Sequence, residues 1–145
     1  MLFRSLDSLK KRVNFLEETF ALLKLENITA IHGRAEEFAK NKAYREQYDL
    51  CVSRAVSNLA TLSEYCLPYV KVGGNFISYK SGTVQEELQQ AEKAVKILGG
   101  KIQDVVYFNL PDSEIQRSLV VIEKMKPTPG RYPRKAGTPL KEPLS

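Results

Sequence analysis

The chain has 145 residues, of which 43% are hydrophobic and 27% charged, and its formal net charge is +5. This length fits one domain with a single core, and no apolar run approaches the roughly 20 residues that cross a bilayer. These values argue against a membrane protein, and a start without the apolar stretch of a signal peptide predicts a cytoplasmic location.

The first predicted elements are a helix and two strands. Five apolar residues recur at alternating steps of four and three and predict a helix over residues 8–23, with Asp7 or Ser8 as its N-cap: Leu9, Val13, Leu16, Phe20 and Leu23. The short β-branched run ITAIH, residues 28–32, predicts a strand. So does the nearly continuous apolar run YDLCVS, residues 48–53, which is typical of a parallel strand covered on both faces.

The alternation of helices and strands continues through the second half. A helix is expected over residues 58–67, then a turn at Gly73 and Gly74, then the strand NFISY. A second helix, residues 84–98, ends at Gly99 and Gly100. Strands 102–110 and 119–122 follow, and their short connection predicts an antiparallel pair. The expected fold is an α/β sheet with helices on both faces, whose ligands bind where parallel strands end.

The last 19 residues differ in composition from the rest. Five of the seven prolines lie in residues 127–143, and residues 127–145 hold four basic side chains against Glu142 alone. The sequence therefore predicts a domain over residues 1–126 and an extended, basic, proline-rich tail over residues 127–145. Such a tail favours an acidic polymer as partner, although a solvated tail without a partner is the competing interpretation.

Four polar positions follow predicted strands and are the candidate functional residues. Asp7 is placed where nucleotide-binding α/β folds bind ribose hydroxyls, although taken alone it is better explained as a helix cap. Glu36, in the segment HGRAEE, is placed to meet a ribose or an adenine, or begins a solvated helix. Arg54 ends the buried strand and needs a partner, which makes it the leading functional candidate. Lys80 ends the next strand and is either a phosphate or base contact or simply solvated.

Several familiar catalytic motifs are absent from the sequence. No GxGxxG, GxxxxGK[ST], GxSxG or HExxH occurs in the chain. The only histidine, His32, has no nucleophile or carboxylate placed beside it, and a hydrogen-bonded loop histidine is the preferred interpretation. Cys51 and Cys66 lack CxxC spacing and are interpreted as buried thiols, so no metal site is expected.

Taken together, six segments resemble the bacterial glucose-inhibited division protein B family, which methylates N7 of a guanine in 16S ribosomal RNA: LDSLKKRVNFL, HGRAEEF, YDLCVSRAV, the LPYVK turn, LVVIEK and TPGRYPRKAGTPLKEPL. The resemblance runs from about Leu6 to Leu144, and YPRKAGTP is its most specific part. It implies a class I S-adenosylmethionine-dependent methyltransferase fold, with S-adenosylmethionine as cofactor. The implied partner is 16S ribosomal RNA or the small ribosomal subunit particle, and the full-length family member is expected to be a monomer.

The resemblance also assigns individual residues. Asp7, Ser8 and Leu9 are expected beside the cofactor ribose, Ala35 and Glu36 beside its adenine, and Arg54 beside the cofactor and the reacting centre. A further set is expected to contact RNA through phosphates or stacking: Lys80, Arg131, Tyr132, Arg134 and Lys135. No catalytic base is required, because guanine N7 has an in-plane lone pair and no proton.

The chain departs from the family pattern at its front. Family members carry an N-terminal helical region and a first strand with a glycine-rich loop before the LDSL segment, and these are expected to be missing here. That strand lies between the strands ending at Asp7 and Ser53, so its loss leaves two unpaired edges and allows self-association. We expect impaired cofactor binding and activity. The alternatives are a non-catalytic RNA-binding remnant and, against the tail signature, a dehydrogenase that uses Asp7 for its ribose.

Overall fold

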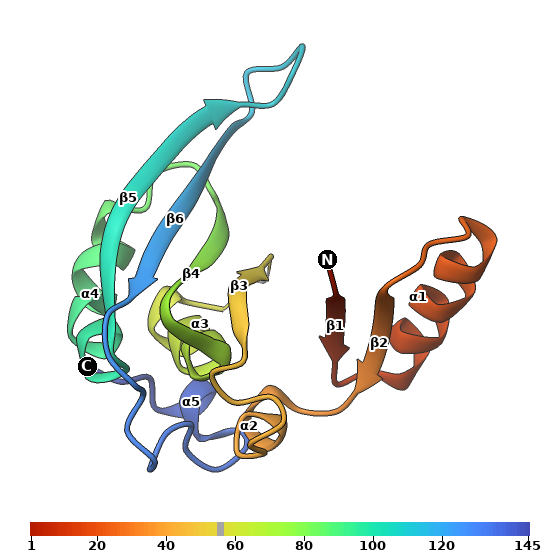
Figure 1. The fold of residues 1–145 in the computed structure, drawn as a ribbon. Helices are drawn as coiled ribbons and strands as arrows, with labels where there is room; N and C mark the ends of the chain where they lie inside the picture. Colours follow the sequence, from red (N-terminus) through yellow and green to blue (C-terminus); the bar gives the residue numbers. More distant parts are fainter. Residues whose placement is uncertain (55–56) are drawn as a thin grey trace.

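The computed structural model describes residues 1–54 and 57–145, and Figure 1 shows their arrangement. The elements in chain order are β1 (Phe3–Asp7), α1 (Lys10–Leu22), β2 (Ile28–His32), α2 (Ala35–Phe38), β3 (Tyr48–Ser53), α3 (Leu59–Cys66), η1 (Leu67–Tyr69), β4 (Val70–Ser81), α4 (Gln85–Ile97), β5 (Gly100–Asn109), β6 (Gln116–Lys124) and α5 (Thr138–Lys141). Within the described residues, no helix has the length and apolar character needed to cross a membrane.

The strands of the described residues form two separate sheets. β1 and β2 form a parallel pair, and the other sheet has the order β3-β4-β6-β5. β3 is parallel to β4, and β6 is antiparallel to β5, as their short connection predicted. β6 is also antiparallel to β4. β1 and β3 face each other across a gap without pairing (Figure 1), so the predicted break between the strands ending at Asp7 and Ser53 is confirmed.

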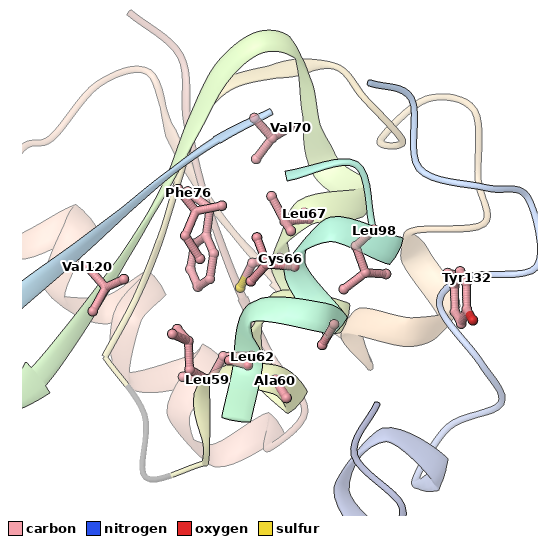
Figure 2. Packing of buried hydrophobic residues seen from close by; sticks show 14 of the residues in the cluster. Leu59, Ala60, Leu62, Cys66, Leu67, Val70, Phe76, Leu98, Val120 and Tyr132 are labelled. Carbon is pink, nitrogen blue, oxygen red and sulfur yellow. The ribbon is translucent and has the colours of Figure 1, made fainter. Parts of the chain in front are cut away.

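The hydrophobic core lies on one face of the four-stranded sheet. Phe76 of β4 pairs in register with Ile122 of β6, and both side chains are fully buried in a cluster with residues of α3 and α4. Figure 2 shows Phe76 among the labelled residues of this cluster. Side chains alternate between the two faces of a strand, so the residues next to these point the other way. On that second face Val52, Tyr79 and Val106 remain 42 to 44% exposed. The described helices therefore cover only one face of this sheet well.

Local structure differs from the sequence expectations at the first helix cap and at the paired glycines. The N-cap of α1 is Leu9, because Asp7 Oδ1 instead accepts the backbone N–H of Leu9 at 2.8 Å and closes the turn before the helix. β4 runs through Gly73 and Gly74 without a turn, and its register with β3 shifts there. A Cβ on Gly74 would lie 2.5 Å from the Asp49 carbonyl oxygen, so this close approach of two strands requires glycine.

Residues 127–145 are anchored to the domain and are not simply extended. They contain the short helix α5, and Thr128, Tyr132 and Pro139 are buried. Tyr132 is part of the core cluster, near Leu98 (Figure 2). The prolines do stop the sheet at Lys124, as predicted, but apolar burial and long-range hydrogen bonds hold the segment against the surface.

Candidate functional site

Asp7 lies at the carboxyl end of β1, in register with His32 at the end of β2. One carboxylate oxygen is used by the Leu9 N–H, and the other lies 3.4 Å from the guanidinium of Arg12. The His32 Nε2 lies 3.1 Å from the Ser8 carbonyl oxygen, so the ring ties the two strand ends together. Asp7 is therefore held in a defined orientation, and His32 has a structural partner in place of a catalytic one.

The turn that contains Ala35 and Glu36 follows the end of β2 directly. A Cβ on Gly33, just before it, would lie 2.1 Å from the Phe38 ring, so glycine lets this ring pack closely against the backbone there. The Tyr69 hydroxyl donates to the Ala35 carbonyl oxygen at 2.6 Å, and burial raises the pKa of Tyr69 well above its ordinary value. The hydroxyl is thus a fixed donor at neutral pH. Glu36 is only 6% exposed, and its Oε1 accepts the backbone N–H of Gly137 at 3.0 Å.

These residues share one cavity of about 650 Å³ between β1 and β3. Its polar lining includes Asp7, Ser8, Ser53, Glu36 and Tyr65. Burial and the neighbouring Glu36 and Glu64 carboxylates raise the pKa of Tyr65, which keeps its hydroxyl protonated. The cavity has the volume of a small-molecule site, with an apolar lining and a few converging polar groups. It brings together four of the six predicted cofactor residues: Asp7, Ser8, Ala35 and Glu36.

Leu9 and Arg54, the other two predicted cofactor residues, are not part of this lining. Leu9 is exposed and caps α1. Arg54 follows β3, next to the lining residue Ser53, and is exposed. Among the described residues its side chain makes no hydrogen bond or ion pair, so the partner that the sequence led us to expect is not found there. Its assignment to the cofactor stays a prediction.

Lys80, predicted as an RNA contact, is held within the protein. Its ammonium group donates to the Ser57 carbonyl oxygen at 2.7 Å and to Glu87 Oε1 at 2.5 Å, and its side chain is 9% exposed. The lysine thus joins the end of β4 to the start of α3 and to α4. In this arrangement it offers no free charge to a phosphate.

The four predicted RNA contacts in residues 127–145 divide into two pairs. Arg131 and Lys135 are exposed, and the Arg131 guanidinium lies 5.1 Å from the centroid of the Tyr132 ring. Tyr132 itself is buried and presents no free ring face for stacking on a base. Arg134 binds Glu64 with two nitrogens, at 2.8 to 3.2 Å. Only Arg131 and Lys135 remain available to RNA in this conformation.

Sequence reasoning missed the residues that hold the site from a distance. Tyr69, Gly137 and Arg45 act through contacts with backbone or carboxylate groups that lie 34 to 101 residues away in the chain. No local pattern marks such pairs. The φ of +87° at Gly137 shows why glycine stands there, but this requirement becomes visible only in the structure.

Comparison with sequence families places the chain among known proteins. The model for GidB, rRNA small subunit methyltransferase G, matches residues 2–120. Ribosomal RNA small subunit methyltransferase G of Lachnoclostridium phytofermentans is 56% identical over 139 residues, which is 96% of this chain and 57% of the relative. The Clostridium tetani protein of the same name is 52% identical, over 96% of this chain and 58% of the relative. The chain thus spans little more than half the length of these relatives.

Solved structures share the fold at low sequence identity. NSun6 from Pyrococcus horikoshii, solved with SFG, has a TM-score of 0.66 at 14% identity and covers 86% of this chain and 42% of its own. TYW2 from M. jannaschii, solved with AdoMet, has a TM-score of 0.63 at 12% identity, and the match covers 86% of this chain and 58% of that chain. The Methanococcus jannaschii fibrillarin pre-rRNA processing protein has a TM-score of 0.61 at 19% identity, and the match covers 86% of this chain and 57% of that chain. These similarities establish a class I methyltransferase-like fold for the chain.

Proposed function

The chain belongs to the rRNA small subunit methyltransferase G family, and on that premise we propose that it forms the nucleoside-binding part of an S-adenosylmethionine-dependent methyltransferase. The proposed reaction is methyl transfer to N7 of a guanine in 16S ribosomal RNA, in the cytoplasm. One observation carries the proposal. Four of the six residues that the family resemblance assigns to the cofactor, Asp7, Ser8, Ala35 and Glu36, line a single cavity where β1 and β2 end.

The cavity fits the nucleoside half of the cofactor better than its methionine half. Asp7 supplies a carboxylate for ribose hydroxyls, and the turn at Ala35 and Glu36 supplies backbone groups for adenine, beside the protonated Tyr65. The sequence contains no glycine-rich loop for the methionine end. The unpaired edges of β1 and β3 face the place where a parallel strand would pair with both. We propose that the N-terminal part carried by the longer relatives supplies that strand and loop.

The chemistry places few demands on side chains. When bound, S-adenosylmethionine supplies a methyl group on a positively charged sulfur. Guanine N7 has a lone pair in the ring plane and no proton to lose, so the protein needs to align the two groups and exclude water. Arg54, exposed at the end of β3, is the proposed residue beside the reacting centre. The absence of a free histidine base agrees with this mechanism, since His32 is bound to Ser8.

The proposal predicts a specific methylated product. The chain should be joined to the N-terminal segment of the Lachnoclostridium phytofermentans relative, which would supply the first strand and loop that the family resemblance implies. The joined protein should then be incubated with S-adenosylmethionine and with 16S ribosomal RNA or small ribosomal subunits. We expect 7-methylguanosine in digests of the RNA by mass spectrometry. Arg54→Ala should lower kcat/KM roughly a hundredfold, whereas Lys42→Ala, an exposed change outside the cavity lining, should not.

A methyl group on another base, or no transfer with both substrates, would refute this assignment. If RNA still bound with strong salt sensitivity and no dependence on the cofactor, a non-catalytic RNA-binding protein would be the better description. The unpaired edges of β1 and β3 also favour self-association of the chain by itself, so the oligomeric state should be measured for both lengths.

Arg131 and Lys135 are the proposed phosphate contacts, because they are exposed and carry no ion pair among the described residues. Replacing both with glutamine in the joined protein should raise the KM for RNA several-fold and lower the slope of log affinity against log salt by about two. The affinity for S-adenosylmethionine should not change. An unchanged salt slope would exclude these two residues from the RNA interface.

A further inference from the structure

The C-terminal segment, residues 127–145, is bound to the domain at points that lie close to the turn that contains Ala35 and Glu36. Arg45, which follows that turn, donates to the carbonyl oxygens of Thr128 and Tyr132, each at 2.8 Å, and to that of Ala39 at 3.2 Å. Glu46 accepts the Thr128 N–H at 2.8 Å. The beginning of the segment is therefore bound to the same stretch of chain that carries the turn.

Arg134 and Glu64 form the central anchor of this segment. Glu64 lies on α3 and is fully buried, and its carboxylate accepts the Arg134 backbone N–H at 2.8 Å as well as the bidentate guanidinium. The Glu64 carboxylate raises the pKa of Arg134, which keeps the charge in place. Arg134 also donates to the Glu142 carbonyl oxygen at 2.6 Å, and this bond gathers the segment around α5. A guanidinium used in this way compensates a buried charge and is not a free RNA contact.

The last part of the segment lines the cavity itself. Gly137 and Leu140 belong to the cavity lining, and the Gly137 N–H binds the carboxylate of Glu36. The Thr61 hydroxyl of α3 donates to the Pro139 carbonyl oxygen at 2.9 Å and fixes α5 on the other side. The side chain of Glu36 is thus turned toward the C-terminal segment, with little of it exposed.

We propose that residues 127–145 act as a strap that positions the adenine-recognising turn at Ala35 and Glu36, with Arg134 as the positioning residue through its bond to Glu64. The inference rests on the proposed function for the identity of the ligand. The segment at Ala35 and Glu36 contains only the four-residue helix α2, so its geometry depends on contacts with other parts of the chain. The Tyr69 hydroxyl of η1 donates to the Ala35 carbonyl oxygen, and the Gly137 N–H of the strap donates to the Glu36 carboxylate.

The first arm of the test needs no ligand. Amide hydrogen exchange in this chain should become about tenfold faster at Gly137, Phe38 and Ala39 in Arg134→Ala, while amides of β6 keep their protection. Lys141→Ala is the matched control. It removes a cation from the same segment, and its exposed side chain makes no hydrogen bond among the described residues. Unchanged exchange at the turn in a folded Arg134→Ala protein would overturn the strap.

The second arm measures recognition of the adenine in the chain joined to its relative's N-terminal segment. Arg134→Ala should weaken the binding of S-adenosylhomocysteine about tenfold. It should also reduce the ratio of the affinities for S-adenosylhomocysteine and S-inosylhomocysteine, which lacks the amino group of adenine. A merely structural loss would weaken both ligands equally and refute positioning. Arg134→Lys keeps the charge without the bidentate geometry and should show a partial effect if Arg134→Ala does not fold. If the unsubstituted joined protein did not bind S-adenosylhomocysteine, only the proposed function would be refuted. The hydrogen-exchange experiment would still test the strap, because it needs no ligand.

Discussion

S-adenosylmethionine is expected to bind the chain joined to the N-terminal segment of its Lachnoclostridium relative at least about a hundredfold more tightly than it binds the chain alone. In the chain alone, β1 and β3 border the cavity with unpaired backbone edges, and water reaches the groups that a strand would cover. A strand between them would pair both edges and fix Asp7 relative to Ser53. The cofactor would then meet a preorganised site and would not have to order it.

Isothermal titration of both proteins at matched concentration measures this difference directly. A third sample, with the N-terminal segment added as a separate polypeptide, should recover part of the affinity if the segment inserts between β1 and β3. Asp7→Ala in the joined protein is the control for site identity and should weaken binding, because the proposed ribose acceptor is lost. Equal affinity of the two lengths would mean that the cavity is complete without a further strand, contrary to our account of the gap.

The sheet could be predicted from the sequence because its signals are local. Apolar runs such as YDLCVS and the short connection between β5 and β6 determine element type and direction within a few residues. The expectation that YDLCVS is covered on both faces was wrong for the described residues, because Leu50 and Val52 are exposed. Even the break between β1 and β3 could be predicted, since the family resemblance shows which strand belongs there. The turn predicted at Gly73 and Gly74 is a register shift in β4, because paired glycines serve a turn and a bulge equally well.

The role of the C-terminal segment could not be predicted, since its partners lie far away in the chain. The basic residues predicted an acidic partner, and for Arg134 that partner is Glu64, 70 positions earlier, in place of RNA. Composition reports charge without reporting which charge is already compensated inside the fold. For the same reason Lys80, at a strand end, was expected to contact RNA, whereas its ammonium group forms an ion pair with Glu87.

The sheet has one covered face and one open face, and substitutions on the two faces should differ sharply. Phe76→Ala is expected to destabilise the chain by about 3–5 kcal/mol, because it empties a fully buried site between β4 and the helices. Val52→Ala lies on the opposite face, in register with Ile77, and should cost less than about 1 kcal/mol in the chain alone. Urea unfolding followed by circular dichroism measures both.

The same two substitutions in the joined protein separate two interpretations of the open face. If the N-terminal segment covers it, Val52 becomes buried, and Val52→Ala should then cost roughly 1.5–2.5 kcal/mol, near the transfer value of two methyl groups plus a small cavity term. Phe76→Ala should cost the same in both lengths, because its surroundings do not change. A cost for Val52→Ala that stays below about 1 kcal/mol in both proteins would mean that the added segment completes the cavity edge without covering the sheet. The face that holds Val52, Tyr79 and Val106 would then be a permanent surface of the protein.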